Sequence, residues 1–197
     1  YDRLVMDGEE HISIASLAPD LFCVTFSGLS KSHMVCGFRV GWMILSGNKD
    51  LARDYIAGIN MLSNMRLCSN VPGQSIIQTA LGGYQSADEL LQPGGRIYEQ
   101  REYICQAIEQ IPGLSAVRPD AAFYIFPKID RNYYNIDNDE QFAFELLRQQ
   151  KELVTAGTGF NWHDPDHFRI VFLPDLPKLK VAMDRVAKYL ETKKRHR

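Results

Sequence analysis

Lys31 and Arg39 are the residues of the N-terminal part whose types and spacing could do chemistry. Lys31 follows the run Ser27-Gly28-Leu29-Ser30, and Arg39 comes eight residues later, between two glycines. Small residues let a ligand approach the backbone closely, and a partly desolvated lysine amine suits Schiff-base chemistry. The planar fork of an arginine suits a phosphate, and the hydroxyl and N–H groups of the small-residue run could complete a cradle. Taken alone, Lys31 could also be an ordinary solvated surface lysine.

A second arginine, Arg169, lies in the C-terminal part between Phe168 and Ile170. A charge between two apolar residues of a strand is costly unless it has a partner. From the residues alone, a structural ion pair is the simplest explanation for it.

The apolar pattern predicts the elements that position these residues. Residues 21–26 are apolar almost throughout, which is typical of a strand covered on both faces in a parallel sheet. Ligands of open α/β sheets bind beyond the carboxyl ends of strands, which is where residues 27–31 follow. A second buried strand is predicted over residues 40–45, a helix over residues 50–65, and another helix from Pro72 to about residue 81.

From residue 95 onward the pattern indicates shorter elements. A helix that ends at Pro112-Gly113 is expected, with four isoleucines on one stripe: Ile97, Ile104, Ile108 and Ile111. Because alternation of strand and helix restarts there, we expect an α/β protein with one domain at residues 1–100 and another at 101–197. The remaining predictions are strands at residues 114–117, 122–129, 153–155 and 168–173, and helices at 140–150 and 177–191, the latter burying Leu179, Met183, Val186 and Leu190.

The composition indicates a globular protein and excludes several partners. The chain has 197 residues, 45% of them hydrophobic, and a formal net charge of −2 that offers no field for nucleic acid. No apolar run approaches the ~20 residues of a membrane span. Four separate cysteines in apolar contexts are typical of reduced thiols in a cytoplasmic protein. The basic end, residues 193–197, is expected to be a frayed terminus rather than a binding patch.

The motif Gly28-Leu29-Ser30-Lys31, with Arg39 and Gly41-Trp42 downstream, resembles the pyridoxal-phosphate site of class I/II aminotransferases of fold type I. It is especially similar to the bacterial alanine aminotransferase branch. Four later segments look like landmarks of this family in the same order: residues 69–74, 93–96, 121–129 and 168–171. The resemblance therefore covers the whole chain. It implies an α/β fold in which part of the large cofactor-binding domain precedes a small α+β domain.

The resemblance implies a role for five residues. Lys31 would form the Schiff base with pyridoxal 5'-phosphate and shuttle the proton during catalysis. Arg39 would pair with the cofactor phosphate, with Ser30 as a weaker phosphate ligand, and Tyr1 would hydrogen-bond the 3′-oxygen of the cofactor. Arg169 would clamp the α-carboxylate of the substrate.

The implied reaction moves an amino group between L-alanine and 2-oxoglutarate, in a cytoplasmic homodimer of amino-acid biosynthesis. Another amino-acid specificity, a lyase reaction of the same cofactor, and a non-catalytic folded fragment all remain open. The chain begins with Tyr1, and the aspartate with which this family protonates the pyridine nitrogen would lie three residues earlier. We therefore expect the C-terminal half of an aminotransferase, truncated and inactive by itself.

Three polar segments of the chain could suggest other roles. Ser69 and Asn70 look like the loop that approaches the neighbouring subunit's cofactor in such dimers, although a helix-entry turn is the simpler interpretation. The segment at residues 161–164, with His167 nearby, lacks a convincing third metal ligand, so we expect a polar loop and no metal site. His33 is expected to be a loop residue without a catalytic role.

Overall fold

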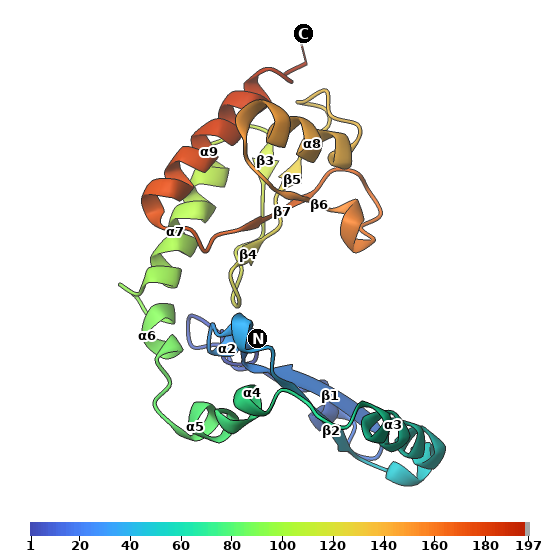
Figure 1. Ribbon diagram of the computed structural model, residues 1–197. Helices are drawn as coiled ribbons and strands as arrows, with labels where there is room; N and C mark the ends of the chain where they lie inside the picture. The colour runs from blue at the N-terminus through green and yellow to red at the C-terminus, as the bar shows by residue number, and fades with distance from the viewer. Residues whose placement is uncertain (196–197) are drawn as a thin grey trace. The chain divides into compact units, whose positions relative to one another are not determined.

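The computed structural model describes residues 1–195. It divides into two compact units, Tyr1–Glu89 and Leu90–Arg197, and helix α6 (Ala87–Leu91) spans the division (Figure 1). This division lies ahead of the boundary expected at residues 100–101. The reason is that helix α7 (Arg96–Glu109) packs along its length on α9 (Leu176–Glu191) and therefore belongs to the second unit.

An antiparallel strand pair forms the centre of the first unit. Strand β1 (Cys23–Gly28) pairs with β2 (Gly41–Ser46), from Cys23 opposite Ser46 to Gly28 opposite Gly41. Both strands lie where the apolar pattern predicts them, but the expected parallel arrangement with both faces covered is wrong for this pair. A parallel connection requires a long crossover, whereas only the short helices α2 (Leu29–Ser32) and η1 (Cys36–Phe38) lie between the strands. Phe26, in mid-strand, is 73% exposed.

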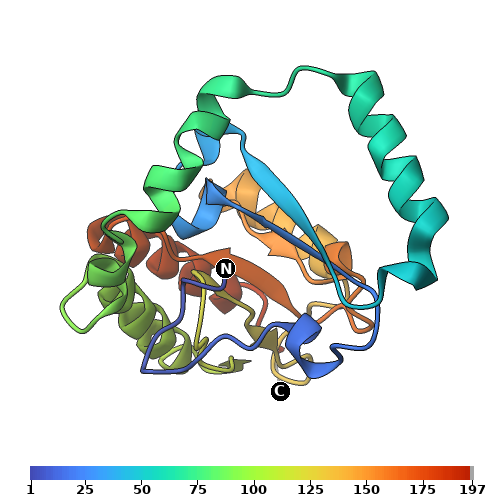
Figure 2. The ribbon, with the colours of Figure 1, turned by 90° about the horizontal axis from the view of Figure 1, so that it is seen from below.

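Helices complete the first unit. Helix α3 (Arg53–Arg66) confirms the predicted helix, but none of its residues is buried, and Figure 2 shows it standing beyond the strand pair. It is preceded by η2 (Lys49–Ala52). Asn48 caps η2 by accepting a hydrogen bond from the Asp50 N–H (3.1 Å). The others are α1 (Ile14–Leu17), α4 (Val71–Ser75), with Pro72 in its first turn as expected, and α5 (Ile77–Gly82).

The second unit contains a three-stranded antiparallel sheet of order β4–β7–β6. Its strands are β4 (Tyr124–Ile125), β6 (Thr155–Ala156) and β7 (Phe168–Val171). A separate antiparallel pair is formed by β3 (Leu114–Ser115) and β5 (Lys128–Ile129). Each predicted strand region of this unit therefore contains a strand, although the observed strands are shorter.

Three helices build the core of the second unit, and their boundaries follow local signals. Asn138 caps α8 (Asp139–Gln150) by accepting from the Gln141 N–H (2.8 Å), and Asp175 caps α9 in the same way. The apolar stripes predicted for α7 and α9 are confirmed, because every member is at most 8% exposed. Phe142 and Leu146 of α8 pack into the same core with Phe168 of β7.

The basic C-terminal segment is more ordered than expected. Lys193 forms an ion pair with Glu145 (2.6 Å), and the backbone of Lys194 forms an antiparallel β-bridge with Tyr134. The Arg195 N–H donates to the Tyr133 carbonyl (3.0 Å). The expectation of a frayed end is therefore wrong for residues 193–195, while residues 196–197 lie outside the described part. Within that part, no helix combines the length and the apolar character needed to cross a bilayer.

Candidate functional site

Lys31 and Arg39 lie at the same end of the β1–β2 pair. Lys31 lies in α2, directly after β1, and Arg39 follows η1, directly before β2. The antiparallel register that places Gly28 opposite Gly41 brings the two ends of the connecting loop together. A lysine amine and a guanidinium are therefore presented by one loop, as their spacing suggested.

Arg39 is an exposed cation whose guanidinium has unused N–H donors. Its backbone is left-handed (φ 50°), which turns the chain from η1 into β2. Within residues 1–195, the guanidinium makes one hydrogen bond, from Nη1 to the carbonyl of Cys36 (2.7 Å). Since a guanidinium carries five N–H donors, the others remain available for an anion such as a phosphate.

The turn that carries Lys31 is held by its neighbours Ser32 and His33. Ser32 is buried, and its hydroxyl lies 3.1 Å from the Gly28 carbonyl and 2.9 Å from Nδ1 of His33. Nε2 of His33 reaches the Ala80 carbonyl of α5 (2.7 Å), and because a carbonyl only accepts, this nitrogen carries the proton. His33 thus anchors the lysine turn to α5, a contact over 47 positions that no local pattern indicates.

Asn70 anchors the other half of the same loop. Its Oδ1 accepts from the Gly73 N–H (3.2 Å) as the N-cap of α4, which confirms the helix-entry turn. Its Nδ2 donates to the carbonyl of Phe38, the residue before Arg39. A cavity of about 520 Å³ lies beside this contact, lined by residues 34–38, Asn70, Pro72 and Gly73.

Gly28 occupies a position that a larger residue could not fill. A Cβ atom there would lie 2.9 Å from the Val40 carbonyl oxygen and 3.2 Å from Cα of Gly41. The two strands approach too closely at this point for a side chain. The candidate phosphate cradle is therefore limited to the side chains of Ser27 and Ser30, both half-buried, and to Arg39.

The other predicted site residues are distributed over both units. Tyr1 is 52% exposed in the first unit, and its carbonyl accepts from the Leu4 N–H (2.9 Å), while Leu4 itself is fully buried. The N-terminus lies near α2 in both views (Figures 1 and 2). Arg169 belongs to the second unit, so the structure describes it apart from Lys31 and Arg39.

Arg169 lies in β7 between aromatic rings. Its guanidinium carbon is 4.8 Å from the centre of the Tyr124 ring and 4.5 Å from that of Phe160. Its Nε atom is buried and makes no hydrogen bond in the described part of the chain. No ion pair to Arg169 exists among residues 1–195, so the anionic ligand is the better of the two explanations for this charge.

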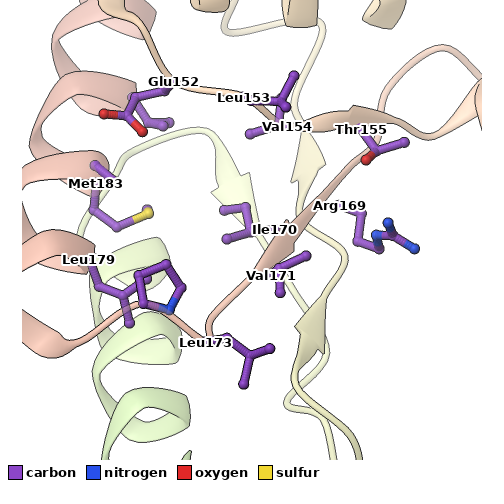
Figure 3. A pocket seen from close by; sticks show the side chains of 13 residues that line it. Glu152, Leu153, Val154, Thr155, Arg169, Ile170, Val171, Leu173, Leu179 and Met183 are labelled. Atoms are coloured by element: carbon purple, nitrogen blue, oxygen red, sulfur yellow. The ribbon is translucent and has the colours of Figure 1, made fainter. Parts of the chain in front are cut away.

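An apolar cavity of about 520 Å³ lies beside the same strand, and Arg169 is among the residues that line it. Figure 3 shows Ile170 directed toward Leu179 and Met183 of α9, whereas the Arg169 guanidinium points away from them. Two charged residues line this cavity, Arg169 and Glu152, and Glu152 is paired with Arg185 (2.7 Å). Apart from Thr155, the other lining residues are apolar.

The loop at residues 161–164 forms a polar and aromatic cluster with Asp166 and His167. Nδ1 of His167 lies 2.5 Å from Oδ1 of Asp166, and Nε1 of Trp162 donates to the same oxygen (3.3 Å). Burial alone would raise the pKa of Asp166, but these hydrogen bonds and the nearby cations hold that pKa below its usual range. In residues 1–195 no three His, Cys, Asp or Glu side chains are grouped as a metal would require.

Comparison with known proteins gives a consistent result. A family model described as aminotransferase class I and II matches residues 1–186. The chain is 55% identical over 190 residues to the glutamate-pyruvate aminotransferase AlaA of Haemophilus influenzae, covering 96% of this chain and 47% of that protein. It is 50% identical to the alanine aminotransferase of Mycobacterium tuberculosis, of which it covers 44%.

Solved structures agree with the sequence relatives. An aminotransferase from Escherichia coli matches with a TM-score of 0.96 and 50% identity, over 100% of this chain and 48% of that one. The alanine aminotransferase from Pyrococcus furiosus matches with a TM-score of 0.88 and 34% identity, over 98% and 48%. The chain thus spans about half the length of the curated relatives it matches.

Proposed function

The chain belongs to the class I and II aminotransferases and has the α/β fold of fold type I, and we propose its function on that premise. We propose that the chain is part of an enzyme that moves an amino group between L-alanine and 2-oxoglutarate. The relatives named glutamate-pyruvate and alanine aminotransferase support this substrate pair. The observation that carries the proposal is the placement of Lys31 and Arg39 at one end of the β1–β2 pair.

Aminotransferases of this class depend on pyridoxal 5'-phosphate. The residues of the first unit fit that group, because Arg39 retains N–H donors suited to a phosphate beside a lysine on the same loop. Lys31 and Arg39 would hold the cofactor, with Ser30 and Tyr1 as further contacts. When bound, the cofactor supplies an aldehyde for the lysine amine and a ring that withdraws electrons from the substrate.

The chain's own residues would divide the work. Nζ of Lys31 would hold the cofactor covalently and, once released, would move the proton between Cα of the substrate and C4′ of the cofactor. Arg39 would fix the phosphate end as a bidentate cation. Arg169 would bind the α-carboxylate and thereby fix the orientation of the substrate's Cα–H bond.

The test is the formation of a reducible adduct at Lys31. Pyridoxal 5'-phosphate is added to the full 197-residue chain, borohydride reduces any adduct, and peptide mass mapping locates it. We expect one adduct per chain at Lys31, which Lys31→Ala abolishes and Lys49→Ala, at an exposed lysine of the same unit, does not. Labelling spread over several lysines, or unchanged in Lys31→Ala, would refute the assignment.

Turnover is a separate measurement. We propose that the chain by itself does not turn over L-alanine and 2-oxoglutarate, because it spans only about half of its relatives' length. An assay for pyruvate and glutamate tests this, and detectable turnover would contradict it. The 30% identical aspartate aminotransferase of Geobacillus stearothermophilus makes L-aspartate the informative competing substrate.

Assembly and location are further parts of the proposal. We propose a homodimer, since α3 and the residue after it expose large apolar side chains, among them Met65 at 78% and Leu67 at 81%. Light scattering after gel filtration measures the mass directly. We also propose a cytoplasmic location, because all four cysteines are free thiols, as is usual in a reducing compartment.

A further inference from the structure

Arg169 combines two ring contacts with a buried Nε–H group that has no acceptor in the described part of the chain. Ring contacts with Tyr124 and Phe160 attract the positive charge without using any N–H donor. Nε of Arg169 is nevertheless buried and unpaired within the described part of the chain. A buried N–H group without an acceptor is rare in a folded protein and calls for an explanation. A planar carboxylate, with two acceptor oxygens in one plane, would supply that acceptor.

Tyr124 and Phe160 reach Arg169 from different elements. The β4–β7 register pairs Tyr124 with Val171, so Tyr124 lies diagonally across from Arg169 on the same face of the sheet. Phe160 ends the short helix η3 (Thr158–Phe160), which follows β6. The two rings therefore come from segments about 35 residues apart in the chain, and only the fold brings them to the same guanidinium.

The short helix that carries Phe160 is anchored by a buried carboxylate, which contacts Thr158. Asp139, 1% exposed at the start of α8, accepts from the Thr158 N–H through Oδ2 and from the Thr158 hydroxyl through Oδ1, both at 2.8 Å. The Phe160 N–H donates to the Gly157 carbonyl (2.8 Å), and its ring meets Phe126 edge-on at 6.4 Å. A chain of contacts thus runs from α8 through Asp139 and η3 to the ring beside Arg169.

We propose that Phe160 is a positioning residue, which η3 holds through Asp139 so that Phe160 and Tyr124 align the Arg169 guanidinium with its Nε edge toward the substrate carboxylate. The proposal rests on the proposed function, because it takes the carboxylate of an amino acid or a 2-oxo acid as the ligand. Replacing the ring would leave Arg169 in place but free to rotate. The loss would then appear in the orientation of the guanidinium and in carboxylate affinity, not in the fold.

The test is NMR of the full chain with ¹⁵N-labelled arginine. The Arg169 Nε–H signal is identified by its disappearance in Arg169→Lys, and the chain is titrated with L-alanine, 2-oxoglutarate and L-alaninamide. We expect the two carboxylates to shift this signal and L-alaninamide, which lacks the carboxylate, to leave it unchanged. Phe160→Leu should broaden the signal and weaken carboxylate binding about three- to tenfold, as the loss of a ring–cation contact implies.

Matched variants separate positioning from folding. Phe160→Tyr keeps a ring and should retain the wild-type signal and affinity, while Phe144→Leu, at an exposed phenylalanine of α8, should change neither. If Phe160→Leu loses helical circular dichroism, Thr158→Val is used in its place, because it removes only the hydroxyl donor to Asp139. Thr158→Val should show the same broadening of the Arg169 signal and the same loss of carboxylate affinity, to a smaller degree. An unchanged Nε–H signal and affinity in a folded variant would overturn the proposal.

The two proposals fail in different ways. A response of Arg169 to carboxylates without an adduct at Lys31 would refute the cofactor assignment and leave the positioning role of Phe160 intact. An adduct at Lys31, together with an Arg169 signal that does not respond to carboxylates, would refute the positioning role of Phe160 and leave the cofactor assignment intact.

Discussion

Glu145 is the carboxylate of the second unit whose protonation should cost the most stability. It accepts hydrogen bonds from Gln141 (2.8 Å), Lys193 (2.6 Å) and the hydroxyl of Tyr189 (2.6 Å). These interactions lower the pKa of Glu145 from 4.5 to about 2, with the Gln141 contribution the largest. Glu145→Gln keeps the shape of the protonated acid and removes its charge at every pH.

The size of the effect follows from the pKa. The difference between 4.5 and about 2 corresponds to roughly 3 kcal/mol at ~1.36 kcal/mol per pH unit. The side chain is 24% exposed, so solvent screens part of this, and we expect Glu145→Gln to lower the free energy of unfolding by about 1–2 kcal/mol at pH 7. Because the folded pKa is the lower one, this stabilisation is present above the unfolded pKa and is lost as pH falls toward 2. At pH 3 the difference between the proteins should be less than half of that at pH 7.

Urea unfolding monitored by Trp162 fluorescence measures the free energy of unfolding of the second unit, which contains Glu145. The chain has two tryptophans, so the experiment is done in a Trp42→Phe background that leaves only the second unit's reporter. Glu140→Gln, at an exposed residue of the same helix, controls for the change in net charge. A free energy of unfolding for Glu145→Gln equal to that of this control at pH 7, or an equal effect of Glu145→Gln at pH 7 and pH 3, would contradict a stabilising role for the Glu145 charge.

Two further predictions concern the loop that carries Lys31 and Arg39, and each uses urea unfolding with Trp42 as reporter in a Trp162→Phe background. Gly28→Ala should destabilise the first unit by about 2 kcal/mol, because the added Cβ would meet the backbone of Val40 and Gly41. Gly82→Ala should not destabilise it, because a Cβ there meets open space. Equal urea midpoints for the two variants would contradict this prediction. Asn70→Ala should cost about 1–2 kcal/mol, since it removes both the cap of α4 and the hydrogen bond to Phe38, and Asn70→Asp, which restores only the cap, should recover part of the loss.

Helices with a complete apolar stripe were the most predictable part of the fold. The stripes of α7 and α9 are local, repeat every three or four residues, and are bounded by glycine, proline or a capping aspartate, so the neighbouring sequence suffices to define them. Strand pairing was less predictable. An apolar run such as residues 21–26 indicates a strand, but its partner and direction depend on segments distant in the chain.

The sequence by itself determined which residues could do the chemistry: the spacing of Lys31 to Arg39, the glycines around them, and the position of Arg169 in a strand. Only the tertiary structure decided what surrounds each one. His33 meets Ala80, Asn70 meets Phe38, and Arg169 lies against Tyr124 and Phe160. The physical reason is that periodicity and capping act within a few residues, whereas hydrogen bonds and ring contacts between distant segments form only when packing brings their elements together.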